Sequence, residues 1–430
     1  MAPENLRGNL TAIGLAVALT IPGLASAVSD AHITPWAAAL LYGIAVVGAA
    51  FLMAWGAEVL QLDVSQGLAL AVLALIAVLP EYAVDFVFTA KAGKNPTEYA
   101  PLALANMTGG NRLLIGVGWS LVVLLAAWRM RRIAKRDGYE GPLDDDVTLG
   151  RAHSIEIGFL LVATLYSLTL PFKRSITLID AAVLVTLFVA YLVRVARAPA
   201  DEPDLIGPAA LIGTLPQRRR RIVVGVMLVG AAAVILGCAE GFAEALVETG
   251  SQFGVSKFLL VQWLAPLASE APELLVAGLF AWRLNTEAGL GALVSSKVNQ
   301  WTLLVGTLPI VFAVSSNSLH GLPLDALQRE ELFLTAAQSA FAVAVLANRS
   351  VSVKEAVSLF GLFLSQFLLG AVLPEHLKEL ERIGVGIVYL MLAAVMIYRQ
   401  RGAFRPLLRD GFRTPASELV HADAMPETVA

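Results

Sequence analysis

The stretch IAVLPEYAVDF, residues 76–86, places two carboxylates, Glu81 and Asp85, inside an apolar run that is otherwise typical of a membrane-spanning helix. A charged acid near the middle of a bilayer costs roughly 2.5–3.5 kcal/mol on insertion scales, so intramembrane acids are usually retained for a function. Asp85 follows Glu81 by one helical turn and is predicted to lie on the same face. The stretch therefore predicts a membrane helix that carries part of a polar site.

The composition of the chain indicates an integral membrane protein. Hydrophobic residues make up 57% of the 430 residues and charged residues only 15%, with a mean hydropathy of +0.72. A soluble domain is usually about a quarter charged. The net charge of -3 and the placement of basic residues at the ends of apolar segments argue against nucleic-acid binding.

Other classes of protein lack the residues they need. The chain has no G-x-x-x-x-G-K-[ST] motif, so we expect no bound nucleotide and no ATP-driven step. The five histidines fall in predicted loops and the tail without metal-ligand spacing, which argues against an enzyme and against a resident cofactor. Cys238 is the only cysteine, so no disulfide forms within the chain.

The apolar windows long enough to cross about 30 Å of hydrocarbon predict about twelve membrane spans. They lie at 10–29, 36–60, 66–90, 100–127, 155–171, 176–196, 221–249, 256–282, 287–315, 331–347, 354–373 and 383–399. The fold class is therefore an all-helical polytopic membrane protein.

The distribution of Lys and Arg predicts the orientation, because these residues collect on the cytoplasmic side. Of the 31 basic residues, 21 follow an even number of spans, 8 follow an odd number, and Arg112 and Lys297 lie inside spans. Both termini are thus predicted to be cytoplasmic, in a plasma membrane of bacterial type. Residues 10–29 also have the character of a signal peptide, and cleavage there would leave the mature N-terminus outside.

An internal repeat relates the two halves of the chain. The segment DVSQGLALAVLALIAVLPE ends at Glu81, and GVSKFLLVQWLAPLASEAPE ends at Glu273; the distance from the serine to the glutamate is 16 residues in the first copy and 17 in the second. Each copy is followed by a span rich in small, amide and hydroxyl residues, LALANMTGGNRLLIGVG (102–118) and GLGALVSSKVNQWTLLVG (289–306). The first copy enters from inside and the second from outside, so the repeats are inverted.

Inverted repeats place a substrate site near the midplane, where interrupted helices from the two repeats meet. Pro80 and Pro272 lack a backbone donor, so each frees a carbonyl beside a carboxylate. Ca²⁺ prefers a shell of carboxylate, carbonyl and water oxygens. The two Pro-Glu helices therefore predict a site for a hard cation.

These motifs resemble the two α-repeats of the calcium/cation antiporter superfamily, of the sodium/calcium exchanger type. In that family a G-T-S-L-P-E pattern is followed by G-N-x-x-G-S-N. The resemblance covers about residues 50–373. It implies a core of five plus five helices in inverted repeats, with one extra helix at each end.

The resemblance assigns the divalent-cation ligands to Glu81 and Glu273. In the first repeat Asn106, Gly109 and Asn111 match the amide and glycine motif, with Gly110 in place of its serine. In the second repeat Ser269 and Ser296 fit hydroxyl positions, whereas Ala292 and Lys297 replace the two asparagines. The candidate cation-binding residues are Glu81, Asp85, Asn106, Asn111, Ser269, Glu270, Glu273 and Ser296.

Lys297 departs most from the family pattern. Its ammonium is predicted to balance charge, either by neutralising one of the four acids when the site is empty or by pairing with an acid for structure. Asp85 replaces a family Ser or Thr, and Glu270 is an added acid. We expect Arg112, which follows Asn111, to point away into a structural pair.

These observations predict a secondary active antiporter that exchanges Ca²⁺ for Na⁺ or H⁺ by alternating access. The alternatives are a Na⁺/H⁺ antiporter in which Lys297 replaces a bound cation and, less favoured, a cation channel or a membrane enzyme. Its predicted partners are inorganic cations and membrane lipid. The predicted parts are an N-terminal segment (1–35), two repeat halves (36–200 and 218–373), an extra C-terminal span (374–400) and a cytoplasmic tail (401–430).

Overall fold

The structure, a computed structural model, describes residues 6–28, 33–63, 79–138, 145–197, 205–254 and 256–419. Among them, eleven helical segments are long and apolar enough to cross a membrane. They are Leu6–Ala27, Pro35–Leu60, Pro96–Arg136, Arg151–Phe172, Leu178–Val195, Gln217–Phe253, Lys257–Trp282, Thr286–Ser316, Ala326–Asn348, Val353–Val372 and His376–Arg399. Each coincides with a predicted span, so the all-helical membrane class is confirmed. The remaining predicted span, 66–90, lies largely outside the described residues, and its last part is helix α4 (Leu79–Lys94).

The chain divides into two compact units, each built from two stretches of sequence. Unit 1 comprises Met1–Asn106 and Ala200–Pro272, and unit 2 comprises Met107–Pro199 and Glu273–Ala430. The boundaries fall inside helices α5 (Pro96–Leu113) and α11 (Lys257–Trp282). Each unit thus combines segments from both predicted repeat halves, and the limits of those halves stay a prediction.

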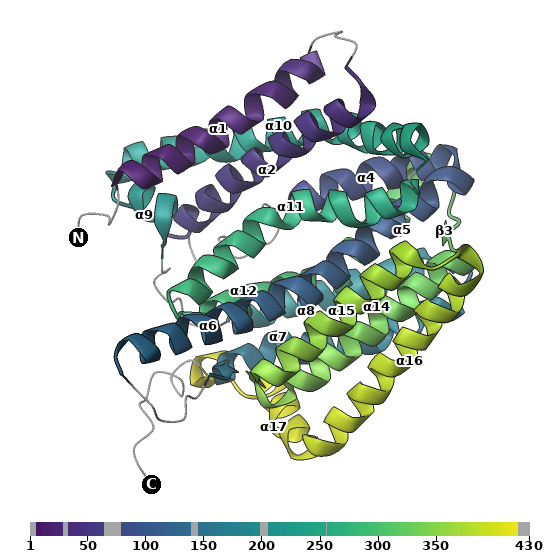
Figure 1. The fold of residues 1–430 in the computed structure, drawn as a ribbon. Coiled ribbons are helices and arrows are strands. Elements are labelled where there is room, and N and C mark those ends of the chain that lie inside the picture. Colours follow the sequence, from purple (N-terminus) through teal and green to yellow (C-terminus); the bar gives the residue numbers. More distant parts are fainter. Residues whose placement is uncertain are drawn as a thin grey trace. The chain divides into compact units, whose positions relative to one another are not determined.

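Unit 1 is built around three long helices, α1 (Leu6–Val28), α2 (Pro35–Leu60) and α10 (Gln217–Phe253), which lie side by side (Figure 1). Small residues let their backbones approach, as is usual between helices in lipid. At Gly48, a Cβ atom would lie 2.6 Å from the backbone oxygen of Ala16. The other elements that the structure describes in unit 1 are α4, the short helix α9 (Gly207–Gly213), and the parts of α5 and α11 up to the boundaries.

The end of α2 is joined to the start of α10 by a buried ion pair. Asp63 accepts hydrogen bonds from Arg220 Nε at 2.7 Å and Nη2 at 2.9 Å, and Arg221 adds a third contact. The hydrogen bonds from Arg220 and its positive charge lower the pKa of Asp63 to about 2, although burial alone would raise it. Beyond this pair, α10 exposes large apolar side chains such as Val226 and Val229, which suits a surface that faces lipid.

Unit 2 contains the remaining described helices, and within it α16 (Glu375–Arg399) packs against both α14 (Ala326–Val345) and α15 (Val353–Val372) (Figure 1). The α-helices that lie wholly within it are α6 (Ser120–Arg136), α7 (Ser154–Ser167), α8 (Leu178–Val195), α12 (Thr286–Asn299), α13 (Val305–Ser316), α14 (Ala326–Val345), α15 (Val353–Val372), α16 (Glu375–Arg399) and α17 (Arg401–Phe412). Capping boxes begin α8, α14 and α15, where Thr177, Asp325 and Ser352 bond the backbone three residues later.

Two short antiparallel ladders join loops of unit 2. Strand β1 (Val147–Thr148) pairs with β4 (Ser350–Val351), and β2 (Ser175–Ile176) pairs with β3 (Leu322–Pro323). Three single turns of 3-10 helix complete the connections: η2 (Arg151–His153), η3 (Leu170–Phe172) and η5 (Leu346–Asn348). These ladders fasten the ends of helices that are far apart in sequence.

Both helices of the predicted amide-rich repeats contain a π-helical segment. In the first, η1 (Leu114–Trp119) lies between α5 and α6. In the second, η4 (Gln300–Leu304) lies between α12 and α13. Single π-helical turns are rare and often mark functional sites, so the repeats share an irregular feature at matching places.

Candidate functional site

The first Pro-Glu helix presents its acids on a buried face. Glu81 and Asp85 lie one turn apart on α4, and their side chains are 6% and 0% exposed. The i, i+4 spacing puts both carboxylates on one side of the helix, as predicted. The buried face of α4 therefore carries two carboxylates, one helical turn apart, in an otherwise apolar protein.

Asp85 is bound to the amide helix of the same repeat. Asn106, on α5, donates from Nδ2 to Asp85 Oδ1 at 2.8 Å, and both side chains are buried. In the part of the chain that the structure describes, Asp85 Oδ2 and Asn106 Oδ1 have no hydrogen-bond partner. Buried oxygens without a donor are costly, so this pair offers two adjacent side chains whose oxygens suit a cation or a proton.

The second Pro-Glu helix, α11, carries its candidates on both sides of the boundary between the units. In unit 1, Ser269 bonds back to the backbone oxygens of Ala265 and Pro266 at 3.2 and 3.3 Å, and Glu270 is 2% exposed. Pro272 stands inside the helix and leaves the carbonyl of Ala268 without its usual backbone donor.

Glu273 belongs to unit 2, where its carboxylate hydrogen-bonds the side chain of Ser296 on α12. Both side chains are partly exposed. The structure therefore joins the second Pro-Glu motif to the serine of the following helix. In the first repeat a Pro-Glu helix is likewise joined to the following helix, by the bond between Asp85 and Asn106.

Lys297 and Asn111 join the two amide-rich helices. Lys297 Nζ donates to the backbone oxygen of Asn111 at 2.6 Å and to its Oδ1 at 2.5 Å, and both side chains are fully buried. Asn111 lies three residues before η1, and Lys297 lies three residues before η4. Residues at matching places in the two repeats are thus bonded to each other.

The aromatic ring of Trp301 completes the surroundings of the lysine. Lys297 Nζ lies 5.4 Å from the centre of the Trp301 ring, a favourable place for a desolvated cation. Trp301 is fixed by a hydrogen bond from its Nε1 to Ser339 at 2.7 Å. Trp301 was not among the site residues predicted from the sequence. Its position four residues after Lys297, one helical turn away, was the signal that could have indicated this contact.

Arg112 points into a separate pair, as expected. Its Nη2 lies 3.0 Å from Glu331 Oε2 on α14, and both side chains are buried. Gln338 on the same helix also donates to the backbone oxygen of Arg112. This buried pair fastens the end of α5 to α14.

The candidates thus form three bonded pairs: Asp85 with Asn106, Glu273 with Ser296, and Asn111 with Lys297. Across the described residues, no three His, Cys, Asp or Glu side chains are grouped to hold a metal ion. The predicted approach of Glu81 to Glu273, which belong to different units, stays a prediction.

The sequence model of the sodium/calcium exchanger protein family matches residues 34–196 and 223–370. The chain belongs to this family. The first matched stretch runs from α2 to α8 and the second from α10 to α15, so α1, the short helix α9, α16 and α17 lie outside the matched residues. This agrees with the predicted five-plus-five core that has an additional helix at each end.

Solved structures extend the comparison to the whole chain. The crystal structure of an H⁺/Ca²⁺ exchanger, CAX, is 40% identical, matches with a TM-score of 0.86, and covers 97% of this chain and 100% of its own. The structure of native YfkE is 14% identical, with a TM-score of 0.58 over 89% of this chain and 100% of its own, which concerns the fold alone. Among curated proteins, none matches the chain.

Proposed function

We propose that this membrane protein is a secondary active antiporter that carries Ca²⁺ in exchange for H⁺ or Na⁺. The observation that carries the proposal is the Asp85–Asn106 pair, a buried carboxylate and amide that leave two oxygens without donors beside Glu81. Such oxygens suit a hard cation when it is bound and a proton when it is absent. The similarity to an H⁺/Ca²⁺ exchanger over nearly the whole chain supports the same substrate.

The site is proposed to form where the two repeats meet, with Glu81 and Glu273 as the principal Ca²⁺ ligands. Asp85, Glu270, Ser269, Ser296 and the amides Asn106 and Asn111 complete the set of oxygens. The site opens to the two sides of the membrane in turn, as inverted repeats allow. This assigns transport rather than a chemical reaction to the protein, and it needs no cofactor.

Charge balance favours protons as the exchanged ion. Four ionised acids would leave an empty site at -3 once Lys297 is included, which is costly in a medium of low dielectric. Protonation of one or more acids removes that charge during the return step. The ammonium of Lys297 neutralises part of this negative charge without any ion from solution.

One rival is supported by a specific contact. Because Lys297 already occupies both oxygens of Asn111, the lysine could stand for one cation in a site that exchanges Na⁺ for H⁺. In that case Ca²⁺ would not be a substrate. The two functions differ in which ion moves when only one gradient is imposed.

Reconstituted vesicles separate these functions. We expect ⁴⁵Ca²⁺ uptake to follow an imposed pH gradient with no Na⁺ present, and to accelerate when unlabelled Ca²⁺ is loaded on the opposite side. Uptake of ²²Na⁺ under the same pH gradient, without Ca²⁺ uptake, would support the rival instead. Ca²⁺ flux without acceleration by opposite loading would indicate a channel and contradict antiport.

A further inference from the structure

Helix α17 follows the last span and has two different faces. On one face, Leu407, Asp410 and Gly411 are buried against the rest of unit 2. On the outward side an arginine recurs every fourth residue, at Arg401, Arg405, Arg409 and Arg413, and all four are exposed. Because the span of α16 ends at Arg399 and α17 begins at Arg401, this helix lies where the chain leaves the membrane.

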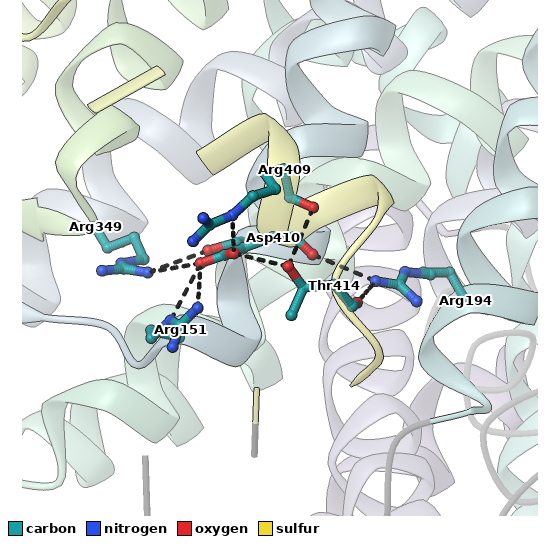
Figure 2. A network of polar contacts seen from close by, with 7 residues as sticks. Arg151, Arg194, Arg349, Arg409, Asp410 and Thr414 are labelled. Carbon is teal, nitrogen blue, oxygen red and sulfur yellow. Dashed lines mark hydrogen bonds and ion pairs between the residues drawn. The ribbon is translucent and has the colours of Figure 1, made fainter. Parts of the chain in front are cut away.

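Asp410 fastens the helix to the body of unit 2 (Figure 2). Its carboxylate accepts hydrogen bonds from Arg151 Nε and Nη2 at 3.1 and 3.0 Å and from Thr414 Oγ1 at 2.9 Å, and Arg349 lies 3.9 Å away. Burial raises the pKa of Asp410, but the bonds from Thr414 and Arg151 outweigh this effect and hold it below its usual value. The carboxylate therefore stays ionised near neutral pH.

The backbone at the end of α17 is held as well. Arg194, on α8, donates to the carbonyl oxygens of Asp410, Gly411 and Thr414. Gly411 packs so closely that a Cβ atom there would lie 2.6 Å from the backbone oxygen of Ser154. These contacts fix which face of α17 points away from the protein.

The outward face combines positive charge with apolar side chains. In the part of the chain that the structure describes, Arg401, Arg405 and Arg413 form no ion pair, and Arg401 lies over the ring of Tyr398 at 5.2 Å. Beside them Leu408 is 39% exposed, whereas the ring of Phe412, 40% exposed, packs on Phe159 of α7 with the ring centres 5.0 Å apart. Arginine together with exposed leucine is typical of helices that lie in the headgroup region of a bilayer.

We propose that the outward face of α17 binds the phosphate groups of anionic phospholipids in the leaflet on its side of the membrane. The planar guanidinium forms paired hydrogen bonds with phosphate oxygens. A row of arginines at four-residue spacing presents these donors along one line of headgroups. The distribution of Lys and Arg predicts that this is the cytoplasmic leaflet, which carries anionic lipid.

The proposal is tested by replacing the three arginines that form no ion pair, while Arg409 and Asp410 are left in place. In vesicles that contain spin-labelled phosphatidylglycerol or phosphatidylcholine, electron spin resonance gives the relative association of each lipid with the protein. We expect R401Q/R405Q/R413Q to lower the preference for phosphatidylglycerol at least several-fold at low salt. The matched variant R401K/R405K/R413K should retain most of it, because it keeps the charge.

A local readout guards against contributions from other basic residues. The emission of an environment-sensitive fluorophore attached to Leu408→Cys, in a Cys238→Ala background, should shift to the blue when phosphatidylglycerol replaces phosphatidylcholine. In the glutamine variant this shift should vanish. The same phosphatidylglycerol preference and the same fluorescence shift in the glutamine variant as in the parent would overturn the proposal.

Discussion

At Lys297, a positive charge that belongs to the chain binds the oxygens of the residue that occupies the matching place in the other repeat. Asn111 gives both its backbone oxygen and its Oδ1 to the ammonium. A mobile cation would need oxygens of the same kind. We therefore propose that the lysine acts as a tethered cation in part of the site.

Replacing this lysine should make the cycle depend more on ions from solution. Lys297→Asn removes the ammonium and frees the oxygens of Asn111, so we expect tighter Ca²⁺ binding and more counter-ions moved per cycle. The reversal potential of exchange in proteoliposomes measures this stoichiometry, and Lys354→Asn, at an exposed lysine, is the control. Identical affinity and stoichiometry in Lys297→Asn and the parent would mean that the lysine is only a structural partner.

Asn106 provides a second test at the scale of one residue. Asn106→Ala removes the donor to Asp85 and one candidate ligand oxygen, and a hydrogen bond to a charged group contributes about 1.5–3 kcal/mol. We therefore expect the apparent KM for Ca²⁺ in flux assays to rise by about tenfold or more. As a control, Asn95→Ala breaks a similar but exposed hydrogen bond to Glu98 and should leave KM near that of the parent. An unchanged KM in Asn106→Ala would count against a role of the Asp85–Asn106 pair in Ca²⁺ binding.

At the scale of elements, the sequence predicted the helices well, because the length of an apolar segment can be read directly from its residues. Each described span coincides with a predicted window. The π-helical segments η1 and η4 could not be predicted, since an extra residue in a turn depends on packing against neighbouring helices. The bond between Lys297 and Asn111 was missed for a similar reason, because it joins residues 186 positions apart.

The junction of α2 and α10 leads to a prediction about pH. The pKa of Asp63 in the folded protein, about 2, lies below its usual value of 3.8. The carboxylate therefore stabilises the fold above about pH 4, and this contribution is lost as the pH falls toward 2. Asp63→Asn should lower the stability at pH 7 by on the order of 1–2 kcal/mol.

Thermal unfolding in detergent measures this effect. We expect the Tm of Asp63→Asn to lie below that of the parent at pH 7, and the gap to narrow below about pH 4. Asp137→Asn, at an exposed carboxylate paired with Arg136, is the control and should change Tm little. A gap of constant size from pH 7 to pH 3 would contradict the role given to the Asp63 charge.

At the scale of the whole molecule, the resemblance of two short motifs to a known family implied both the family and the five-plus-five core, and the family is confirmed. The motifs could not predict how the chain divides into compact units, because the boundaries fall inside α5 and α11. They also gave no sign of the Asp410 network, which brings together arginines from three separate stretches of sequence. Long-range ion pairs of this kind are settled by the packing of complete helices.

We propose that Glu81 and Glu273 serve one shared cation site. ⁴⁵Ca²⁺ exchange in proteoliposomes by the single variants Glu81→Gln and Glu273→Gln tests this most directly. Glu81→Gln and Glu273→Gln should each reduce the exchange rate to the background of empty vesicles while folding and membrane insertion stay intact, because each removes a principal ligand. Glu98→Gln, at an exposed glutamate, should exchange at nearly the parental rate. Near-parental exchange by both Glu81→Gln and Glu273→Gln would contradict the account.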